Sequence, residues 1–291
     1  MRTIIVNDKN DGKKLNNVIL SEFKNLNINS LYKALRKKDI KVNGNRISEN
    51  IIVHKDDIID IYISDTFLLG GTDFTKPEVI FSKDNILYED KNIIAINKPA
   101  QIEVEGKDSL TEMLSKFLNS TIYPCHRLDR NTSGVIIFAK NKDSLDILLQ
   151  KFKDHEIEKH YKAICYGIFK KKNEILSAYL FKDNKKSMVY ISDTPKKGYK
   201  KILTEYTIIS ENAKDNTSTL DVILHTGKTH QIRAHLAHIG HPIIGDGKYG
   251  INEINKKFNK KFQMLESTSI IFRFTNNSGF LEYLNGMKIQ I

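Results

Sequence analysis

Five apolar residues at positions 135–139 directly follow a polar segment at positions 125–134. A short apolar run after a turn signal is typical of an interior strand, and the Thr-Ser-Gly sequence that ends the polar segment can turn the chain tightly. The polar segment carries one carboxylate, Asp129, between two arginines. A strand can hold such a carboxylate at a loop mouth as a reactive group, and a salt-bridged turn residue is the alternative interpretation.

Length and composition indicate a folded chain with a polyanionic partner. The 291 residues suit two domains, or one large domain with a small one, and 40% hydrophobic residues suffice for a core. Lysine and arginine number 46 against 35 aspartate and glutamate residues, a formal net charge of +11. This excess favours binding to nucleic acid or to an anionic membrane surface, although a generally basic proteome would also produce it.

The cysteine pattern and the hydropathy profile indicate a reducing compartment. Cys125 and Cys165 form no disulfide framework and have no metal-type spacing. No apolar run approaches the roughly 18 residues of a membrane span, and no charged-then-apolar leader opens the sequence. We therefore expect a cytoplasmic location without membrane association.

The first 64 residues contain the patterns of a small α/β domain. Apolar residues recur at helical spacing from Leu15 to Leu26, and a second helix is predicted at 31–38. Asn43-Gly44 is a strong hairpin signal, because both residues can adopt positive φ, and isoleucines at 58–63 predict a closing strand. The outward face of the second helix carries Lys33, Arg36 and Lys37.

A polar, glycine-containing segment at 65–80 is predicted to be a linker, and a larger domain at 81–291 follows it. This domain opens with predicted paired strands at 86–88 and 93–96, after which Lys98 either approaches a phosphate or occupies a turn. Further predicted elements are a helix at 145–152 capped by Asn141 or Asp143, strands at 188–191 and 220–224, and a helix capped by Thr229 that packs through Ile232, Leu236 and Ile239.

Five of the nine histidines fall between positions 225 and 241. A metal hydrolase would cluster histidines in this way. However, their spacing fits no zinc-binding helix pattern, and no carboxylate lies at 226–242 to complete a site. We therefore expect no metal site, and metal-dependent hydrolysis is kept as an alternative function.

Three segments, in this order, resemble the motifs of the RluA-type family of RNA pseudouridine synthases. The first is His-Arg-Leu-Asp-Arg-Asn-Thr-Ser-Gly at 126–134, and the second is Lys-His-Tyr-Lys-Ala-Ile-Cys-Tyr-Gly at 159–167. The third begins at 224–236 and continues through glycine-rich stretches to 250. The resemblance covers most of residues 81–274.

The resemblance implies an α+β pseudouridine synthase fold with a central mixed, largely antiparallel sheet. It implies an isomerisation in which the N1–C1′ bond of uridine breaks, the base turns in place, and C1′ rejoins C5. Asp129 matches the catalytic aspartate, Tyr161 the active-site tyrosine, and Arg233 the arginine that pairs with the aspartate. Arg127 matches a residue that helps to hold the rearranged RNA. This chemistry requires no cofactor, metal or energy input.

The N-terminal domain, residues 1–64, resembles the S4-like RNA-binding module. The resemblance lies in two helices followed by Lys-Val-Asn-Gly at 41–44. A basic helix of that module lies on RNA phosphates, so Lys33, Arg36 and Lys37 are the expected RNA contacts. A solvated helix face that binds nothing is the alternative interpretation of the same pattern.

The implied partner is RNA, with 23S ribosomal RNA as the expected substrate and transfer RNA as the alternative one. The family resemblance also implies a monomer without an obligatory protein partner. A non-catalytic S4-type RNA-binding factor is the main alternative function, and it would bind RNA without modifying uridine. A metal-dependent RNA hydrolase that uses the 225–241 histidines would instead shorten its substrate.

Overall fold

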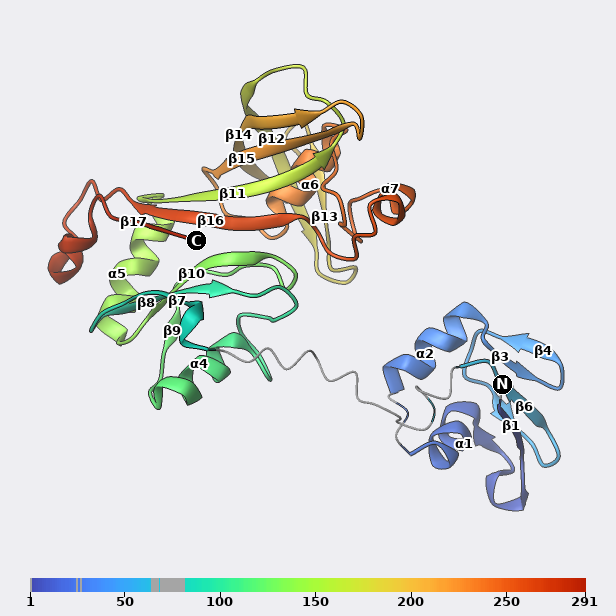
Figure 1. Cartoon of the computed structure of the whole chain (residues 1–291). Coiled ribbons are helices and arrows are strands. Elements are labelled where there is room, and N and C mark those ends of the chain that lie inside the picture. The colour runs from blue at the N-terminus through green and yellow to red at the C-terminus, as the bar shows by residue number, and fades with distance from the viewer. Residues whose placement is uncertain (1, 25, 27, 64–67, 69–81) are drawn as a thin grey trace. The chain divides into compact units, whose positions relative to one another are not determined.

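The computed structural model describes residues 2–24, 26, 28–63, 68 and 82–291 (Figure 1). Contacts along the chain divide it into two compact units, Met1–Glu78 and Val79–Ile291. The predicted linker at 65–80 lies outside the described residues except for Leu68, so the predicted domain limits at 64 and 81 stay predictions. Each unit has its own hydrophobic core and is described by itself.

The N-terminal unit packs two helices against a small antiparallel sheet. Its described strands form a four-stranded sheet in the order β1 (Arg2–Ile5), β6 (Ile58–Ile61), β3 (Ile40–Val42) and β4 (Asn45–Ile47), and a two-stranded sheet of β2 (Lys13–Lys14) and β5 (Ile52–Val53). The helices are α1 (Leu15–Glu22) and α2 (Ile28–Lys37), and a short 3-10 turn, η1, spans Asp8–Asn10. Both predicted helices are present, although α1 ends at Glu22, before Phe23 and Leu26, and α2 begins before the predicted Leu31 and ends at Lys37. Asn43 and Gly44 have φ of 50° and 79°, which confirms the predicted hairpin.

The C-terminal unit is built on one large sheet. Its strand order is β13 (Met188–Ser192), β12 (Asn173–Asp183), β14 (Lys200–Asn212), β15 (Thr217–Leu224), β11 (Ile157–Tyr166), β16 (Leu265–Phe272), β10 (Ser133–Ala139), β8 (Ile93–Lys98) and β7 (Ile86–Glu89). Two short strands extend it, because β17 (Lys288–Gln290) pairs with β16 and β9 (Tyr123–Pro124) pairs with β10. Among the described strands, β10 and β16 alone pair in parallel, which confirms the predicted mixed, largely antiparallel sheet.

Strands β8 and β10 are covered on both faces, and this explains their continuous apolar sequences. Successive side chains of a strand point to opposite faces. On β10, Ile136 and Phe138 therefore join the core that contains Leu114 of α4 (Leu110–Leu118). Val135 and Ile137 join the opposite core, which contains Leu148 of α5 (Lys142–Lys153) and Leu281 of η3 (Gly279–Leu284). The interior strand predicted at 135–139 is confirmed.

Gly134 allows the two halves of the sheet to meet at the β10–β16 contact. It has φ of 108°, and a Cβ atom on it would lie 2.0 Å from the carbonyl oxygen of Ser267. No side chain fits in that space, so Gly134 is required where β10 begins. Figure 1 shows β16 lying between β11 and β10, and it pairs with both.

The remaining helices confirm one predicted cap and correct another. Asn141 caps α5 through its side chain, as predicted, whereas Thr229 does not cap α6 (Gln231–His238). The N-cap of α6 is His230, whose φ of 54° turns the chain there, and the Gln231 side chain accepts the Lys228 N–H instead. The other short helices are η2 (Lys83–Asn85) and α7 (Asn252–Lys257).

Candidate active site

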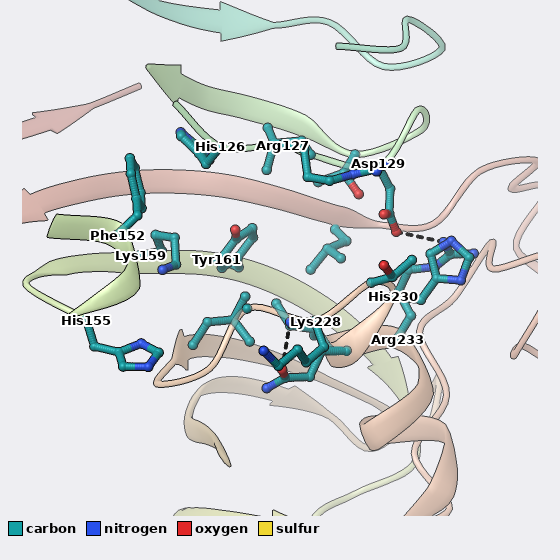
Figure 2. Close-up of a pocket in the computed structure, with 18 of the residues that line it drawn as sticks. His126, Arg127, Asp129, Phe152, His155, Lys159, Tyr161, Lys228, His230 and Arg233 are labelled. Atoms are coloured by element: carbon teal, nitrogen blue, oxygen red, sulfur yellow. Dashed lines mark hydrogen bonds and ion pairs between the residues drawn. The ribbon is translucent and has the colours of Figure 1, made fainter. Parts of the chain in front are cut away.

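Asp129 lies at the junction of two depressions in the C-terminal unit. The first has a volume of about 420 Å³ and lies between the Asp129 loop, β11 and the segment that joins β15 to α6 (Figure 2). The second has a volume of about 660 Å³ and extends toward β13 and the Lys182 end of β12. The residues that line both are Arg127, Leu128, Asp129, Thr229, His230 and Arg233. The side chain of Asp129 is 17% exposed, so a ligand can reach it from either side.

Arg233 joins Asp129 to a second carboxylate. Its Nη1 donates to Oδ2 of Asp129 at 2.8 Å, while Nε and Nη2 donate to the two oxygens of Asp246 at 2.6 and 3.0 Å. Asp246 is completely buried, and the backbone N–H groups of Lys248 and Tyr249 also donate to it. The guanidinium is therefore fixed from behind by Asp246 and presents one N–H to Asp129.

The electrostatic environment keeps Arg233 and Asp246 ionised. Burial alone would lower the pKa of Arg233, but its bonds to Asp246 and the charge of Asp129 raise that pKa above its ordinary value. Burial opposes ionisation of Asp246 as well, yet the Arg233 guanidinium and two backbone donors hold its pKa below the usual range. One guanidinium between two carboxylates leaves one negative charge, and Asp129 is the carboxylate of the pair that faces the pocket.

Tyr249 and His230 cover the other side of Arg233. The guanidinium carbon lies 5.3 Å from the centroid of the Tyr249 ring, a cation–π contact. The Tyr249 hydroxyl accepts the Val189 N–H at 2.9 Å and lies 2.8 Å from Nδ1 of His230. These contacts attach α6 to β13 and limit the orientations that Arg233 can adopt.

Tyr161 contributes the aromatic wall of the pocket. It lies on β11 with 5% of its surface exposed, between the Asp129 end and Lys159 in Figure 2. Burial, reinforced by the charge of Asp129, raises the pKa of the phenol far above its ordinary value. Tyr161 is therefore a neutral phenol at physiological pH, able to stack on a base and to donate a hydrogen bond.

Lys98 anchors the Asp129 loop through hydrogen bonds to backbone carbonyl groups. It is fully buried, and its ammonium donates to the carbonyl oxygens of Pro99, Ile102 and Arg130 at 2.9, 2.8 and 3.1 Å. Burial lowers its pKa to about 8, partly offset by the negative charge of Asp129. Both interpretations from sequence, a phosphate contact and a turn lysine, are therefore wrong. Lys98 is the last residue of β8, and its buried side chain satisfies backbone carbonyls that the two loops leave unpaired.

The other predicted site residues fall into two groups. Arg127 is exposed and lines both depressions beside Asp129. The side chains of Lys33, Arg36 and Lys37 are exposed on α2, in the N-terminal unit. The structure brings Asp129, Tyr161 and Arg233 to one pocket, whereas their chemical roles, and RNA binding by the α2 residues, stay proposals.

The clustered histidines do not converge on one point. His225 pairs with Glu205, His238 pairs with Asp193, and His235 bonds to Thr204. Within the part of the chain that the structure describes, no group of three or more His, Cys, Asp or Glu side chains could hold a metal ion. The histidine-based hydrolase interpretation therefore has no geometric support in these residues.

The site contains two residues whose importance the sequence analysis missed. Asp246 bonds to Arg233 across 13 positions, and its only local signal is a lone carboxylate between two glycines. Lys159 lines the pocket beside Tyr161, and the two-residue spacing on a strand indicates a shared face. Neither signal identifies a site, because the sequence alone does not show that Asp246 meets Arg233 or that Lys159 enters the pocket.

Comparisons with known proteins identify similar proteins of one family. Residues 92–238 match the family described as RNA pseudouridylate synthase. The chain is 34% identical to the ribosomal large subunit pseudouridine synthase C of Buchnera aphidicola subsp. Acyrthosiphon pisum, with 99% of this chain and 92% of that protein covered. It is 33% identical to the protein of the same name from Rickettsia bellii, with 82% of each covered.

A solved structure shares the fold. Human RNA Pseudouridylate Synthase Domain Containing 4 superimposes with a TM-score of 0.58 at 22% identity, covering 72% of this chain and 88% of that one. Across the described residues, no helix combines the length and the apolar character that crossing a bilayer would demand.

Proposed function

This chain belongs to the RNA pseudouridylate synthase family, and from that premise we propose that it isomerises uridines of large-subunit ribosomal RNA with Asp129 as the catalytic residue. The enzyme class itself, an RNA pseudouridine synthase, follows from the family and from relatives that match over most of the chain. The observation that supports Asp129 is its 2.8 Å contact with Arg233 at the edge of a pocket sized for a nucleoside.

The proposed reaction begins when the target uridine leaves its helix and enters the pocket. Flipping a base costs a few kcal/mol, which stacking on Tyr161 and phosphate contacts can recover. Arg127, exposed at the mouth, occupies the space that the base leaves in the RNA. The base that enters the pocket displaces water, which strengthens every electrostatic interaction of Asp129.

Asp129 then acts as a nucleophile or as a general base, and both roles require the ionised carboxylate. Arg233 stabilises that form and fixes one of its oxygens, leaving the other free to face the substrate. The N1–C1′ bond breaks, the uracil turns, C5 bonds to C1′, and the proton lost from C5 is balanced by one gained at N1. Every atom of the substrate is kept, so the step consumes no oxidant, reductant or energy carrier.

Tyr161 has two parts in this proposal. Its ring stacks against the uracil, and its neutral hydroxyl hydrogen-bonds near the ring carbon that loses a proton. Because burial and the Asp129 charge hold the phenol protonated, its pKa argues for a proton relay and against a phenolate base. The two residues therefore divide the chemistry, with negative charge on Asp129 and a neutral donor on Tyr161.

Ribosomal RNA is the proposed substrate because relatives that match most of the chain carry the name ribosomal large subunit pseudouridine synthase C. The N-terminal unit, which we propose to be an S4-like module, would supply phosphate contacts through Lys33, Arg36 and Lys37. We further propose that the protein acts as a monomer in the cytoplasm, where ribosomal RNA is found. Transfer RNA is the competing substrate.

Carbodiimide-based pseudouridine mapping of total RNA, with and without the gene, tests this function. We expect specific pseudouridines in 23S ribosomal RNA to disappear without the gene and to return when the gene is restored. Loss of pseudouridine from transfer RNA alone would contradict the ribosomal substrate. An unchanged map in every RNA would contradict the activity.

A further inference from the structure

The pocket is also lined by basic side chains. Four of them form what we call the basic end: Lys153, His155, Lys159 and Lys228, of which Lys228 lies nearer the middle of the pocket than His155 and Lys159 in Figure 2. In Figure 2, Phe152, His155 and Lys159 lie at one side of the pocket, Asp129 with Arg233 and His230 at the other, and Tyr161 between them. The mechanism proposed above uses none of the four.

Lys159 is the buried member of this group and, among the residues that the structure describes, has no carboxylate partner. It is 7% exposed, and within the described part of the chain the one hydrogen bond of its ammonium is a 3.5 Å contact with the carbonyl oxygen of Ile157. Its ammonium lies 5.4 Å from the centroid of the Phe152 ring, and burial lowers its pKa to about 8. A buried ammonium without an anion is costly, and an anionic ligand would remove that cost.

The carboxylates near the basic end are engaged elsewhere. Asp154 accepts two bonds from Gln150, and Glu205 is bonded to His225. Partial burial, together with the charges of Lys159 and Lys228, lowers the pKa of His155. Among the residues that line the pocket, Asp129 is the only carboxylate, and it is bonded to Arg233.

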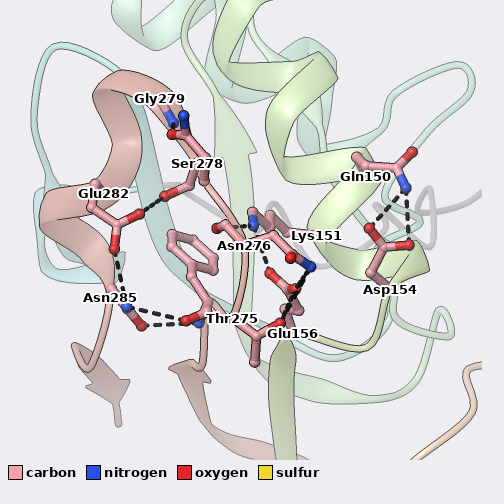
Figure 3. Close-up of polar contacts among 12 residues, drawn as sticks. Gln150, Lys151, Asp154, Glu156, Thr275, Asn276, Ser278, Gly279, Glu282 and Asn285 are labelled. Carbon is pink, nitrogen blue, oxygen red and sulfur yellow. Dashed lines mark hydrogen bonds and ion pairs between the residues drawn. The ribbon is translucent and has the colours of Figure 1, made fainter.

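The turn that carries Lys153 and His155 is fixed from behind (Figure 3). Lys151 forms an ion pair with Glu156 at 2.6 Å and donates to the carbonyl oxygen of Asn276 at 2.7 Å, and both charged side chains are buried. Glu156 also accepts the Asn276 side-chain amide at 2.9 Å. The basic end is therefore positioned before a ligand arrives, which reduces the entropy cost of binding.

We propose that the basic end binds one phosphate of the RNA backbone, adjoining the uridine whose base lies against Tyr161 and Asp129. This inference rests on the proposed function, because it assigns the two ends of one pocket to the two ends of one nucleotide. Lysine suits a phosphate as a point charge. A phosphate held at a fixed distance from Asp129 also orients the sugar and the base for reaction.

The test measures binding of the full-length protein to an unmodified 23S ribosomal RNA transcript at several salt concentrations. Lys159→Met and Lys228→Gln should each weaken binding and reduce the slope of log K against log salt by about 1, the effect of losing one phosphate contact. Lys162→Gln is the matched control, because Lys162 is exposed on the opposite face of β11. It should leave the slope unchanged.

Slopes equal to wild type in both pocket variants would overturn the proposal. If Lys159→Met does not fold, as judged by thermal melting, the exposed Lys228 variant decides the outcome. Binding and pseudouridine formation are measured separately, so this result is distinguishable from the proposed function. Pseudouridine formation by the wild-type protein, with unchanged slopes in both pocket variants, would contradict the phosphate site alone. Reduced slopes in the pocket variants, with no pseudouridine formed by the wild-type protein, would contradict the activity alone.

Discussion

At the scale of single residues, the site depends on how one guanidinium is shared. Arg233 uses two of its nitrogens on the buried Asp246 and a third on Asp129. A planar fork of donors can satisfy both carboxylates at once, which a single ammonium cannot. Asp246 thus acts as a positioning residue, because it holds Arg233 and does not itself line either depression.

Arg233→Lys tests this arrangement. We expect kcat to fall by about 10²-fold or more, because the ionised Asp129 loses a preorganised partner. RNA affinity should change by less than about threefold, since most of the affinity comes from phosphate contacts. Single-turnover rates at saturating enzyme, measured beside Arg273→Lys on the exposed surface, separate the two effects. Wild-type kcat in the Arg233 variant would contradict the assignment.

At the scale of secondary structure, local patterns predicted the elements well where a short stretch decides the conformation. The helical spacing of α1, the Asn-Gly hairpin and the apolar run of β10 were correct, because each depends on neighbours in sequence. The predicted Thr229 cap was wrong, since the turn before α6 is set by His230 and by its contact with Tyr249.

The site was predictable only in part, for the same reason. Asp129, Tyr161 and Arg233 were found through family motifs, and the contact between Asp129 and Arg233 joins residues 104 positions apart. Lys98 reads as a turn lysine because its partners, including the Arg130 carbonyl, are not identifiable from sequence. The positions of Asp246 and Lys159 in the site likewise become evident only from the folded sheet.

The stability that the joint between α5 and β11 contributes to the fold should depend on pH through Glu156. Lys151, Thr275 and Asn276 lower the pKa of Glu156 to about 2 from an ordinary value of 4.5. A depressed pKa means that the ionised carboxylate stabilises the fold fully above about pH 5, and that this contribution is lost as the pH falls toward 2. Glu156→Gln should therefore reduce the free energy of unfolding by about 3 kcal/mol at pH 7.

Urea unfolding of wild type and Glu156→Gln at pH 7 and pH 3 measures this dependence. The difference in unfolding free energy between the two proteins should be smaller at pH 3. Glu253→Gln on the exposed side of α7 is the control and should change stability little at either pH. A Glu156 difference that is the same at both pH values would show that the ion pair does not stabilise the joint.

At the scale of the whole molecule, the chain combines a basic N-terminal unit with a catalytic unit. The first 64 residues hold 12 basic and 8 acidic residues, and the exposed face of α2 carries three of the basic ones. Non-specific phosphate contacts raise local substrate concentration without selecting a base. We propose that the N-terminal unit supplies affinity and that the pocket supplies chemistry.

Simultaneous Lys33→Gln, Arg36→Gln and Lys37→Gln substitutions test this division. Glutamine keeps helix propensity close to that of lysine and arginine, so α2 should remain folded. We expect weaker RNA binding, with a salt slope reduced by up to about 3, and an unchanged kcat at saturating RNA. The same charge change at Lys170, Lys171 and Lys172 in the catalytic unit is the control. Equal binding losses in the two triple variants would contradict a specific role for α2.

The most direct test of the whole account is single-turnover pseudouridine formation by Asp129→Ala on an unmodified 23S ribosomal RNA transcript, with RNA affinity measured in parallel. We predict no detectable pseudouridine and an affinity within about threefold of wild type, because the phosphate contacts remain. Asp193→Ala, which removes an exposed carboxylate bonded to His238, should keep full activity. Substantial turnover by Asp129→Ala would contradict the central claim that this carboxylate performs the reaction.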